Sequence, residues 1–401
     1  KPVVLRVLPY TLAHLFLLAL QWMAMLFLPL FFDAQGLNGD AIGVLVSMFS
    51  LATLVLVIPL GMLSDRVSPR ALILAGALLV VLACSMLYYT GGFWYWLAGT
   101  FTIGAGFTLS WISLFSVFFK QVGESKRGLE VSIFNMGGIM GAGLGAWSGG
   151  ALSDVMADPS MIFYLASVFA VAWSATCIKI PETKGISFPI LEYGRDLKKG
   201  PTWILIAIIF IKASHAGIEH ANYSLLQTEV IGLSGRMVGD LFFLLSIWMG
   251  IVTIATGRLH DRQEKPLRMM GAALVLSGAF MAASGAAVSA WDFLVYRIGH
   301  TGGDSILNLL TLVVASMIFP RHRSGGAFAF VLTVNTAAYF IFANIGGVWA
   351  DRLSLQSSFY FAGFIMLLGG VLLMAFRTGI RQYIDREESH IDEIRAAGEG
   401  E

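Results

Sequence analysis

The chain has 401 residues, of which 57% are apolar and only 13% are charged, and its mean hydropathy is +0.77. Soluble domains carry about 25% charged residues, so this composition excludes a soluble globular protein, a disordered protein and a disulfide-rich secreted scaffold. The 26 basic and 25 acidic residues nearly cancel, which leaves no basic field to attract nucleic acid. The remaining class is a polytopic membrane protein.

A transmembrane helix needs about 20 apolar residues, and runs of this size recur along the chain. The first six cover residues 8–32, 41–63, 71–90, 94–119, 129–152 and 160–178. The next six cover residues 202–228, 237–257, 268–289, 292–319, 326–349 and 357–376. We predict an N-terminal six-helix bundle (1–178), a cytoplasmic linker (179–200), a C-terminal six-helix bundle (201–376) and a charged cytoplasmic tail (377–401).

The positive-inside rule gives the orientation. With both termini in the cytoplasm, the predicted cytoplasmic segments hold 22 of the 26 Lys and Arg residues. The opposite loops hold only Arg236 and Arg352, while Lys212 and Arg297 lie inside predicted spans. This asymmetry favours a multi-pass protein of the plasma (inner) membrane with both termini inside.

The two predicted bundles repeat each other at a fixed offset. Gly61–Arg66 follows the second span, and Gly257–Arg262 follows the eighth, 196 residues later. Gly149–Asp154 ends the fifth span, and Gly346–Asp351 ends the eleventh, 197 residues later. Matches at one offset indicate a duplicated six-helix unit in parallel orientation.

The sequence Gly61-Met62-Leu63-Ser64-Asp65-Arg66, with its repeat after the eighth span, resembles the loop signature of the major facilitator superfamily. The resemblance extends over the whole length. It implies an all-α fold of twelve transmembrane helices in two six-helix pseudo-repeats, and transport by alternating access rather than enzymatic activity. It also implies that spans 1, 4, 7 and 10 line a central cavity.

The signature loops also suggest gating contacts between the halves. A helix N-terminus carries about half a positive charge, so Asp65 would stabilise contact with the start of span 11, and Asp261 with the start of span 5. The predicted gating set is Asp65, Arg66, Arg70, Asp261 and Arg262. The alternative is that these residues are ordinary helix ends with cytoplasmic arginines.

Ionisable groups inside a bilayer are costly and usually functional, and here they concentrate in two spans. Span 7 carries Lys212, His215, Glu219 and Asn222 on one helical face. Span 10 carries Arg297, His300, Asp304 and Asn308 on one face. His220 lies off the main face of span 7.

The heights of these residues predict their partners. At 1.5 Å per residue, Lys212 and Asp304 lie about 16 and 21 Å from the cytoplasmic end, and Glu219 and Arg297 about 27 and 31 Å. We therefore predict two ion pairs, Lys212–Asp304 and Glu219–Arg297, with two histidines between them. The set would bind solute and relay a proton; the alternative is a purely structural salt-bridge lattice.

The N-terminal half offers a weakly polar and aromatic lining, with Gln21 in span 1 and Trp111 in span 4 as the best candidates. Such groups suit the apolar body of an amphiphilic solute, although ordinary helix packing uses similar residues. The chain has no phosphate-binding glycine loop, no His or Cys cluster with metal-ligand spacing and no nucleophile elbow. We therefore expect no cofactor, no metal and no ATP drive.

These features together predict a monomeric secondary transporter in the lipid bilayer. Lys212 and Arg297 can each pair with a carboxylate or phosphate, which favours a small polar or anionic organic solute, coupled to protons. One alternative is an exporter of amphiphilic drugs or lipids. A second alternative is an uncoupled facilitator. A third is a transporter-like receptor, which the short linker and tail argue against.

Overall fold

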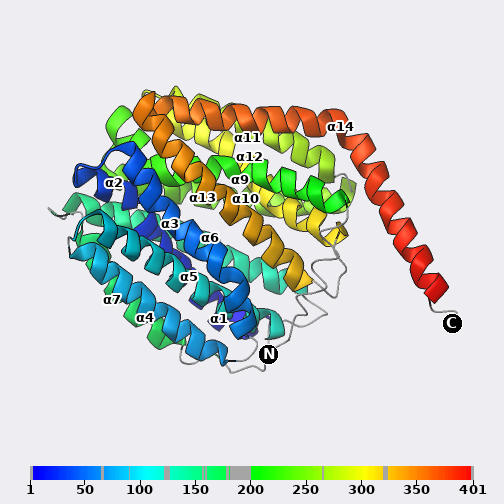
Figure 1. Cartoon of the computed structure of the whole chain (residues 1–401), viewed down its shortest axis with the longest axis horizontal. Helices are drawn as coiled ribbons and strands as arrows, with labels where there is room; N and C mark the ends of the chain where they lie inside the picture. Colours follow the sequence, from blue (N-terminus) through cyan, green and yellow to red (C-terminus); the bar gives the residue numbers. More distant parts are fainter. Residues whose placement is uncertain are drawn as a thin grey trace.

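A computed structural model describes most of the chain. The described residues are 3–64, 67–89, 91–121, 127–155, 158, 160–177, 180, 200–263, 266–318 and 324–398. Within them every regular element is a helix (Figure 1). This confirms the predicted all-α membrane fold.

The helices fall into two sets. The N-terminal set is α1 (Val3–Met25), α2 (Leu28–Ala34), α3 (Gly39–Ser64), α4 (Pro69–Tyr88), α5 (Phe93–Gln121), α6 (Arg127–Val155) and α7 (Met161–Cys177). The C-terminal set is α9 (Gly200–Leu225), the π-turn η2 (Leu226–Val230), α10 (Gly235–Gln263), α11 (Pro266–Gly285), α12 (Ala290–Ile318), α13 (Ser324–Arg352) and α14 (Leu355–Gly398). Every predicted apolar run coincides with one of these helices or with a consecutive pair.

Nine stretches of the described residues are long and apolar enough to cross a membrane. Helices α6, α7 and α12 are not among them. Helix α7 is apolar but has only 17 residues. The count of twelve crossings therefore stays a prediction.

Local sequence signals set several helix ends. The first span divides into α1 and α2 just before Pro29, which has no N–H to donate to the preceding turn. Helix α12 begins with a reciprocal cap, in which the amide of Asp292 donates to Ser289 Oγ at 3.2 Å and that hydroxyl donates to Asp292 Oδ2 at 2.8 Å. Side-chain oxygens of Asn38, Ser234 and Ser354 likewise accept backbone N–H groups at the starts of α3, α10 and α14.

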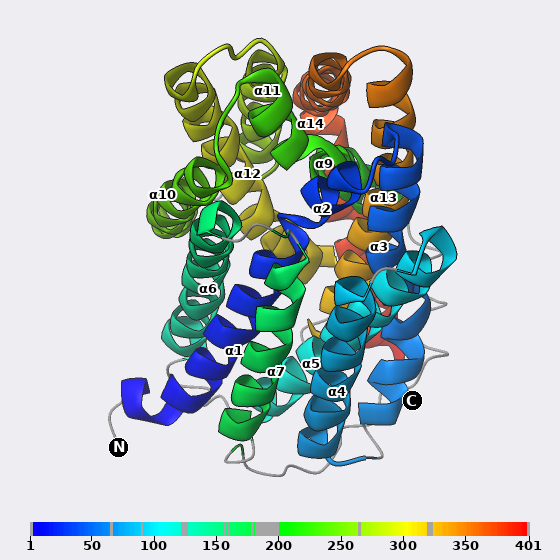
Figure 2. The ribbon, with the colours of Figure 1, turned by 90° about the vertical axis from the view of Figure 1, so that its left-hand side faces the viewer.

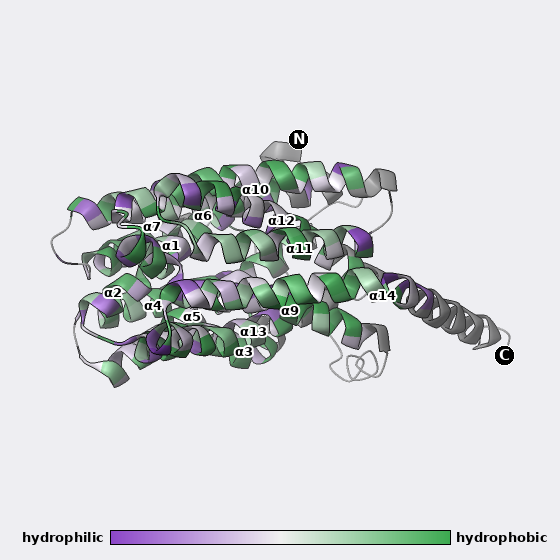
Figure 3. Ribbon diagram, turned by 90° about the horizontal axis from the view of Figure 1, so that it is seen from above, coloured by the Kyte–Doolittle hydropathy of each residue, from purple (hydrophilic) through white to green (hydrophobic). Residues whose placement is uncertain are grey.

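Each set packs mainly within itself, α1 against α6 and α4 against α5 in one set, α11 against α14 and α9 against α13 in the other. The two sets meet along two helix pairs, α3 with α13 and α6 with α10 (Figure 2). Large apolar side chains such as Leu78 and Phe364 remain exposed on the outside, and apolar residues occupy most of the helical ribbon (Figure 3). A lipid-facing exterior explains this exposure, which water would penalise.

Glycines bring the two sets into backbone contact. A Cβ atom added to Gly43 of α3 would lie 2.8 Å from the carbonyl oxygen of Ala343 and 3.0 Å from the Cα of Gly347 on α13. At the other contact, a Cβ on Gly150 of α6 would lie 3.0 Å from the Cα of Gly239 on α10. Small residues allow this approach, and their close packing replaces the hydrophobic driving force that is weak between helices in lipid.

Two predicted segments have different outcomes. The predicted linker lies outside the described residues apart from Ile180 and Gly200. The predicted tail is a continuation of α14, which runs without a break from Leu355 to Gly398 and whose last part leaves the bundle (Figure 1). The division into bundle and tail at residue 377 stays a prediction.

Candidate functional site

Seven charged or polar residues of α9 and α12 form one group of contacts between the two helices, which we call the polar cluster. Its members are Lys212, His215, Glu219, Arg297, His300, Asp304 and Asn308. Four of them are buried, Glu219 and Asp304 are partly buried, and Asn308 is exposed. The two histidines are almost completely buried, with 2% and 1% of their surfaces exposed. Spacings of three and four residues place the side chains on one face of each helix, and the two faces meet.

At one end of the polar cluster, Arg297 forms an ion pair with Glu219. The guanidinium Nη1 donates to Oε1 of the carboxylate. The guanidinium carbon also lies 5.0 Å from the ring centre of Tyr223 and 5.9 Å from that of Phe293. The predicted Glu219–Arg297 pair is thus present, and aromatic faces add cation–π attraction in a site removed from water.

His300 lies beside this ion pair, with its Nε2 atom 3.4 Å from Oε1 of Glu219. Its other nitrogen, Nδ1, lies 3.0 Å from the carbonyl oxygen of Ser277 and 2.9 Å from the hydroxyl of the same residue on α11. The Ser277 hydroxyl can donate as well as accept, so two arrangements satisfy the neutral ring. With the proton on Nδ1, His300 donates to the Ser277 carbonyl; with the proton on Nε2, it donates toward Glu219 while Nδ1 accepts from the Ser277 hydroxyl.

At the other end, the predicted Lys212–Asp304 ion pair is wrong, because a side-chain amide lies between the two charges. Lys212 Nζ donates to Asn308 Oδ1 at 2.5 Å, and Asn308 Nδ2 donates to Asp304 Oδ2 at 3.1 Å. Asn308 lies one helical turn beyond Asp304, and its side chain contacts the ammonium group of Lys212 in place of the Asp304 carboxylate. An amide suits this position because it both accepts and donates.

His215 connects the two ends of the polar cluster. Its Nε2 atom lies 3.6 Å from Asp304 Oδ1. Its ring meets the ring of His300 edge to face, with 4.9 Å between the centres. The contacts thus run without a gap from Lys212 to Arg297, a path with a basic side chain at each end and two histidine–carboxylate pairs in the middle.

Three predicted site residues lie elsewhere. Asn222 donates to the carbonyl of Gly346 at 2.9 Å and to Ser358 Oγ at 3.0 Å, so it joins α9 to α13 and α14 rather than entering the polar cluster. Trp111 packs against Phe115 on its own helix, α5. Gln21 of α1 is partly exposed, and none of the contacts described for the polar cluster includes it or Trp111.

The predicted gating residues are described only in part. Asp65 and Arg66 lie outside the described residues, and Asp261 and Arg262 belong to α10 with side chains that are not described. Arg70 donates twice to the carbonyl oxygen of Ile180, from Nε at 3.2 Å and from Nη2 at 2.7 Å. This contact lies within the N-terminal set, and the gating role stays a prediction.

Sequence reasoning missed several neighbours of the polar cluster. Tyr223 and Phe293 lie four residues from Glu219 and Arg297 on their helices, a spacing that could have identified them. Ser277 could not have been identified in this way, because no ionisable residue lies near it on its helix, α11. Sequence spacing also failed to reveal that possible metal-ligand atoms of His215, Glu219 and His300 all lie within 4.8 Å of one another.

An aromatic contact joins the two sets of helices beside the polar cluster. Trp22 of α1 lies 4.5 Å, centre to centre, from the ring of Phe242 on α10 and 6.5 Å from the ring of His220 on α9. His220 in turn meets Tyr339 of α13 at 5.2 Å. His220, which lay off the predicted polar face, thus belongs to this aromatic junction.

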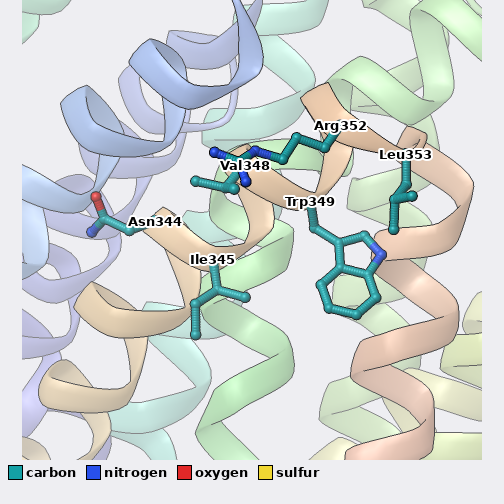
Figure 4. A pocket seen from close by; sticks show the side chains of 6 residues that line it. All are labelled: Asn344, Ile345, Val348, Trp349, Arg352 and Leu353. Carbon is teal, nitrogen blue, oxygen red and sulfur yellow. The ribbon is translucent and has the colours of Figure 1, made fainter.

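A separate cavity of about 500 Å³ lies at the C-terminal end of α13 (Figure 4). Its lining is formed by Asn344, Ile345, Val348, Trp349, Arg352 and Leu353. No member of the polar cluster lines it, and its surface is mostly apolar. The histidine and carboxylate side chains of the candidate site therefore lie in the polar cluster, outside this cavity.

Comparison with known proteins assigns the family. The sequence profile described as Major Facilitator Superfamily matches residues 10–295 and again residues 221–396. An uncharacterized transporter of this type from Methanocaldococcus jannaschii is 23% identical over 360 residues, which cover 84% of this chain and 89% of that protein. The multidrug resistance protein MdtG of Serratia proteamaculans is 30% identical over 158 residues, which cover 38% of each chain.

Solved transporter structures share the fold. A peptide transporter POT in complex with sulfate has a TM-score of 0.76 at 15% identity, with coverage of 94% of this chain and 95% of that chain. The nucleoside transporter NupG has a TM-score of 0.75 at 11% identity, with coverage of 92% and 98%. Because the family profile matches nearly the whole length, this chain belongs to the major facilitator superfamily of membrane transporters.

Proposed function

We propose that this protein is a proton-coupled secondary transporter that moves a small polar or anionic organic solute by alternating access. The observation that carries the proposal is the polar cluster, a continuous path of polar and charged side chains between α9 and α12, in which Lys212, Arg297 and both histidines are buried. Burial of charge inside a membrane protein is costly, and such groups mark solute or proton pathways.

The order of groups in the polar cluster supports a coupling scheme. Glu219 holds Arg297 in an ion pair and lies 3.4 Å from a histidine. Protonation of that carboxylate would remove the charge that restrains the guanidinium, and Arg297 could then bind a carboxylate or phosphate of the solute. Loss of the proton would restore the ion pair and release the solute, so proton and solute would move in a linked cycle.

Reconstituted vesicles test this scheme directly. With an imposed pH gradient, wild-type protein should accumulate its solute from a library of organic acids, nucleosides and peptides. Arg297→Ala should lower uptake at least about tenfold, because a charge-assisted hydrogen bond is worth about 1.5–3 kcal/mol. Glu219→Gln should keep solute exchange but lose the response to the pH gradient, since the amide carries no titratable proton.

Matched controls separate coupling from general damage. Asn222→Ala removes a buried polar side chain of the same helix without touching the polar cluster, so it should keep the pH response even where uptake falls. Uptake that persists in Arg297→Ala, or a pH response that persists in Glu219→Gln, would contradict the proposal. Solute flux that ignores the pH gradient in the wild type would favour an uncoupled facilitator.

Export of amphiphilic drugs or lipids is the second candidate. It rests on the aromatic junction of Trp22, Phe242 and His220 between the two sets of helices, and on the partial similarity to multidrug resistance proteins. Flat aromatic faces bind apolar bodies without demanding one shape. Cells that express the protein should then resist amphiphilic cations, and Trp22→Ala should abolish that resistance more completely than Arg297→Ala.

A further inference from the structure

We propose that His215, Glu219 and His300 form a binding site for one divalent transition metal ion of the Zn²⁺ class. Possible ligand atoms of these three side chains, the two histidines buried and Glu219 partly buried, lie within 4.8 Å of one another. Two imidazole nitrogens and a carboxylate oxygen are ligands that Zn²⁺ and Co²⁺ accept, and three protein ligands leave a coordination position open. This inference does not depend on the solute or on proton-coupled transport.

The helix geometry places the donors before any ion arrives. His215 and Glu219 are four residues apart on α9, so they lie one above the other on the same face. His300 enters from α12, and its Nε2 atom lies 3.4 Å from Glu219 Oε1. Two ligands at about 2.1 Å from a tetrahedral ion are about 3.4 Å apart. This pair therefore already has the separation that a shared ion requires.

The surroundings of His300 suit metal ligation through Nε2. Its Nδ1 lies 3.0 Å from the carbonyl oxygen of Ser277 and 2.9 Å from the hydroxyl of that residue. With the proton on Nδ1, the ring donates to this carbonyl, the outer contact that metal-bound histidines commonly make, and the lone pair of Nε2 is open to an ion. With the proton on Nε2, the ring donates toward Glu219 instead, so binding of an ion requires the first tautomer.

Unpaired atoms in the same cluster give an independent indication. His215 Nδ1 and Asp304 Oδ1 are buried without a hydrogen-bond partner, which is costly in a folded protein unless a water, proton or ion is bound. His215 itself is 98% buried, with 2% of its surface exposed. Asp304 lies 3.6 Å from His215 Nε2, close enough to orient that ring or to become a fourth ligand.

The charges near the site set its electrostatic cost. A divalent ion would be balanced by the two carboxylates of Glu219 and Asp304. Lys212 and Arg297 would then remain as two cations, the first held by Asn308 and the second packed over the ring of Tyr223. Arg297 Nη1 donates to Oε1 of Glu219, the same oxygen that lies 3.4 Å from His300 Nε2. An ion bound between His300 and Oε1 therefore requires the guanidinium to move to Oε2, which neither contact uses.

Metal titration of the purified full-length chain tests the proposal. Protein without a polyhistidine tag is titrated with Co²⁺, whose visible absorption reports imidazole ligation, and with Zn²⁺ in a calorimeter. One ion per chain is expected, with binding that weakens as the pH falls, because protons compete for the ligands. His300→Gln and Glu219→Gln should each weaken binding at least about tenfold.

His220→Gln is the matched control, because it removes a histidine from the same helix that packs against Tyr339 and not within the site. It should keep the wild-type affinity. His215→Gln is the second test variant, and gel filtration with circular dichroism identifies any variant that is not folded. Absence of the Co²⁺ absorption in folded wild-type protein, or equal losses in His220→Gln and His300→Gln, would overturn the metal site.

Discussion

Arg297 and Glu219 show at the scale of single residues how a membrane protein tolerates buried charge. The ion pair, two aromatic rings and the sulfur of Met281, 3.7 Å from Nη1, surround the guanidinium. In such a site one charge without its partner is far more costly than no charge at all. The pair is therefore kept or lost as a unit.

A double variant tests this coupling. Arg297→Leu and Glu219→Leu should each lower stability by about 3–5 kcal/mol, because each leaves one buried charge uncompensated. The double variant should be destabilised much less than the sum, since no charge remains. Apparent Tm in detergent for the four proteins measures the effect, and strictly additive losses would show that the two side chains do not depend on each other.

At the scale of helices, close backbone contacts join the two sets along α3 with α13 and α6 with α10. Gly43 and Gly347 let α3 and α13 approach until main-chain atoms nearly touch, and Gly150 and Gly239 do the same for α6 and α10. Alternating access requires the two sets to move relative to each other. Contacts that rely on packing of small residues, rather than on buried salt bridges, are suited to repeated separation.

A bulky residue should block this approach. A Cβ on Gly347 would lie 2.8 Å from the Cα of Gly43, so Gly347→Leu should force α3 and α13 apart, lower the apparent Tm and reduce transport. Gly379→Leu is the control, because a Cβ at Gly379 meets no atom within 4 Å. Wild-type transport in Gly347→Leu would show that this contact is not needed in the transport cycle.

At the scale of the whole molecule, the distribution of charge predicts how the protein sits in its membrane. The predicted loops on one side carry 22 basic residues and those on the other side only two, an asymmetry that predicts cytoplasmic termini. The polar cluster lies between these two surfaces on α9 and α12. A site at mid-depth can be exposed to either side in turn.

Cysteine labelling tests the orientation. The native Cys84 and Cys177 are both buried, so they contribute little background and can be replaced by alanine. A membrane-impermeant maleimide should label Leu353→Cys in intact cells, because that residue is exposed in the connection between α13 and α14. Gly379→Cys should react only in inverted vesicles or permeabilised cells. The reverse pattern would contradict inward termini.

Much of this architecture could be predicted because a bilayer imposes simple rules. Uninterrupted apolar runs must become helices, since the backbone has no water to bond with. The Glu219–Arg297 pair could also be predicted, because helical periodicity selects the face and the rise per residue gives the height.

Neither the length of the apolar runs nor helical periodicity predicts the individual polar contacts between helices. Asn308 and Asp304 lie one turn apart on the same face, and only the crossing of α9 and α12 decides that the amide, not the carboxylate, receives Lys212. Asn222 lies one turn beyond Glu219, yet its neighbours there are Gly346 and Ser358. The residue pattern along one helix does not specify where the neighbouring helices lie.

The sequence by itself therefore determined the class of protein, its helices, its internal repeat and the two helices that carry buried charge. Only the tertiary structure decided which polar atoms touch, that His300 lies between Ser277 and Glu219, and that three possible metal ligands from two helices share one space. The reason is physical: hydropathy and periodicity act along one helix, whereas hydrogen bonds and ligand geometry depend on distances of a few ångströms between helices.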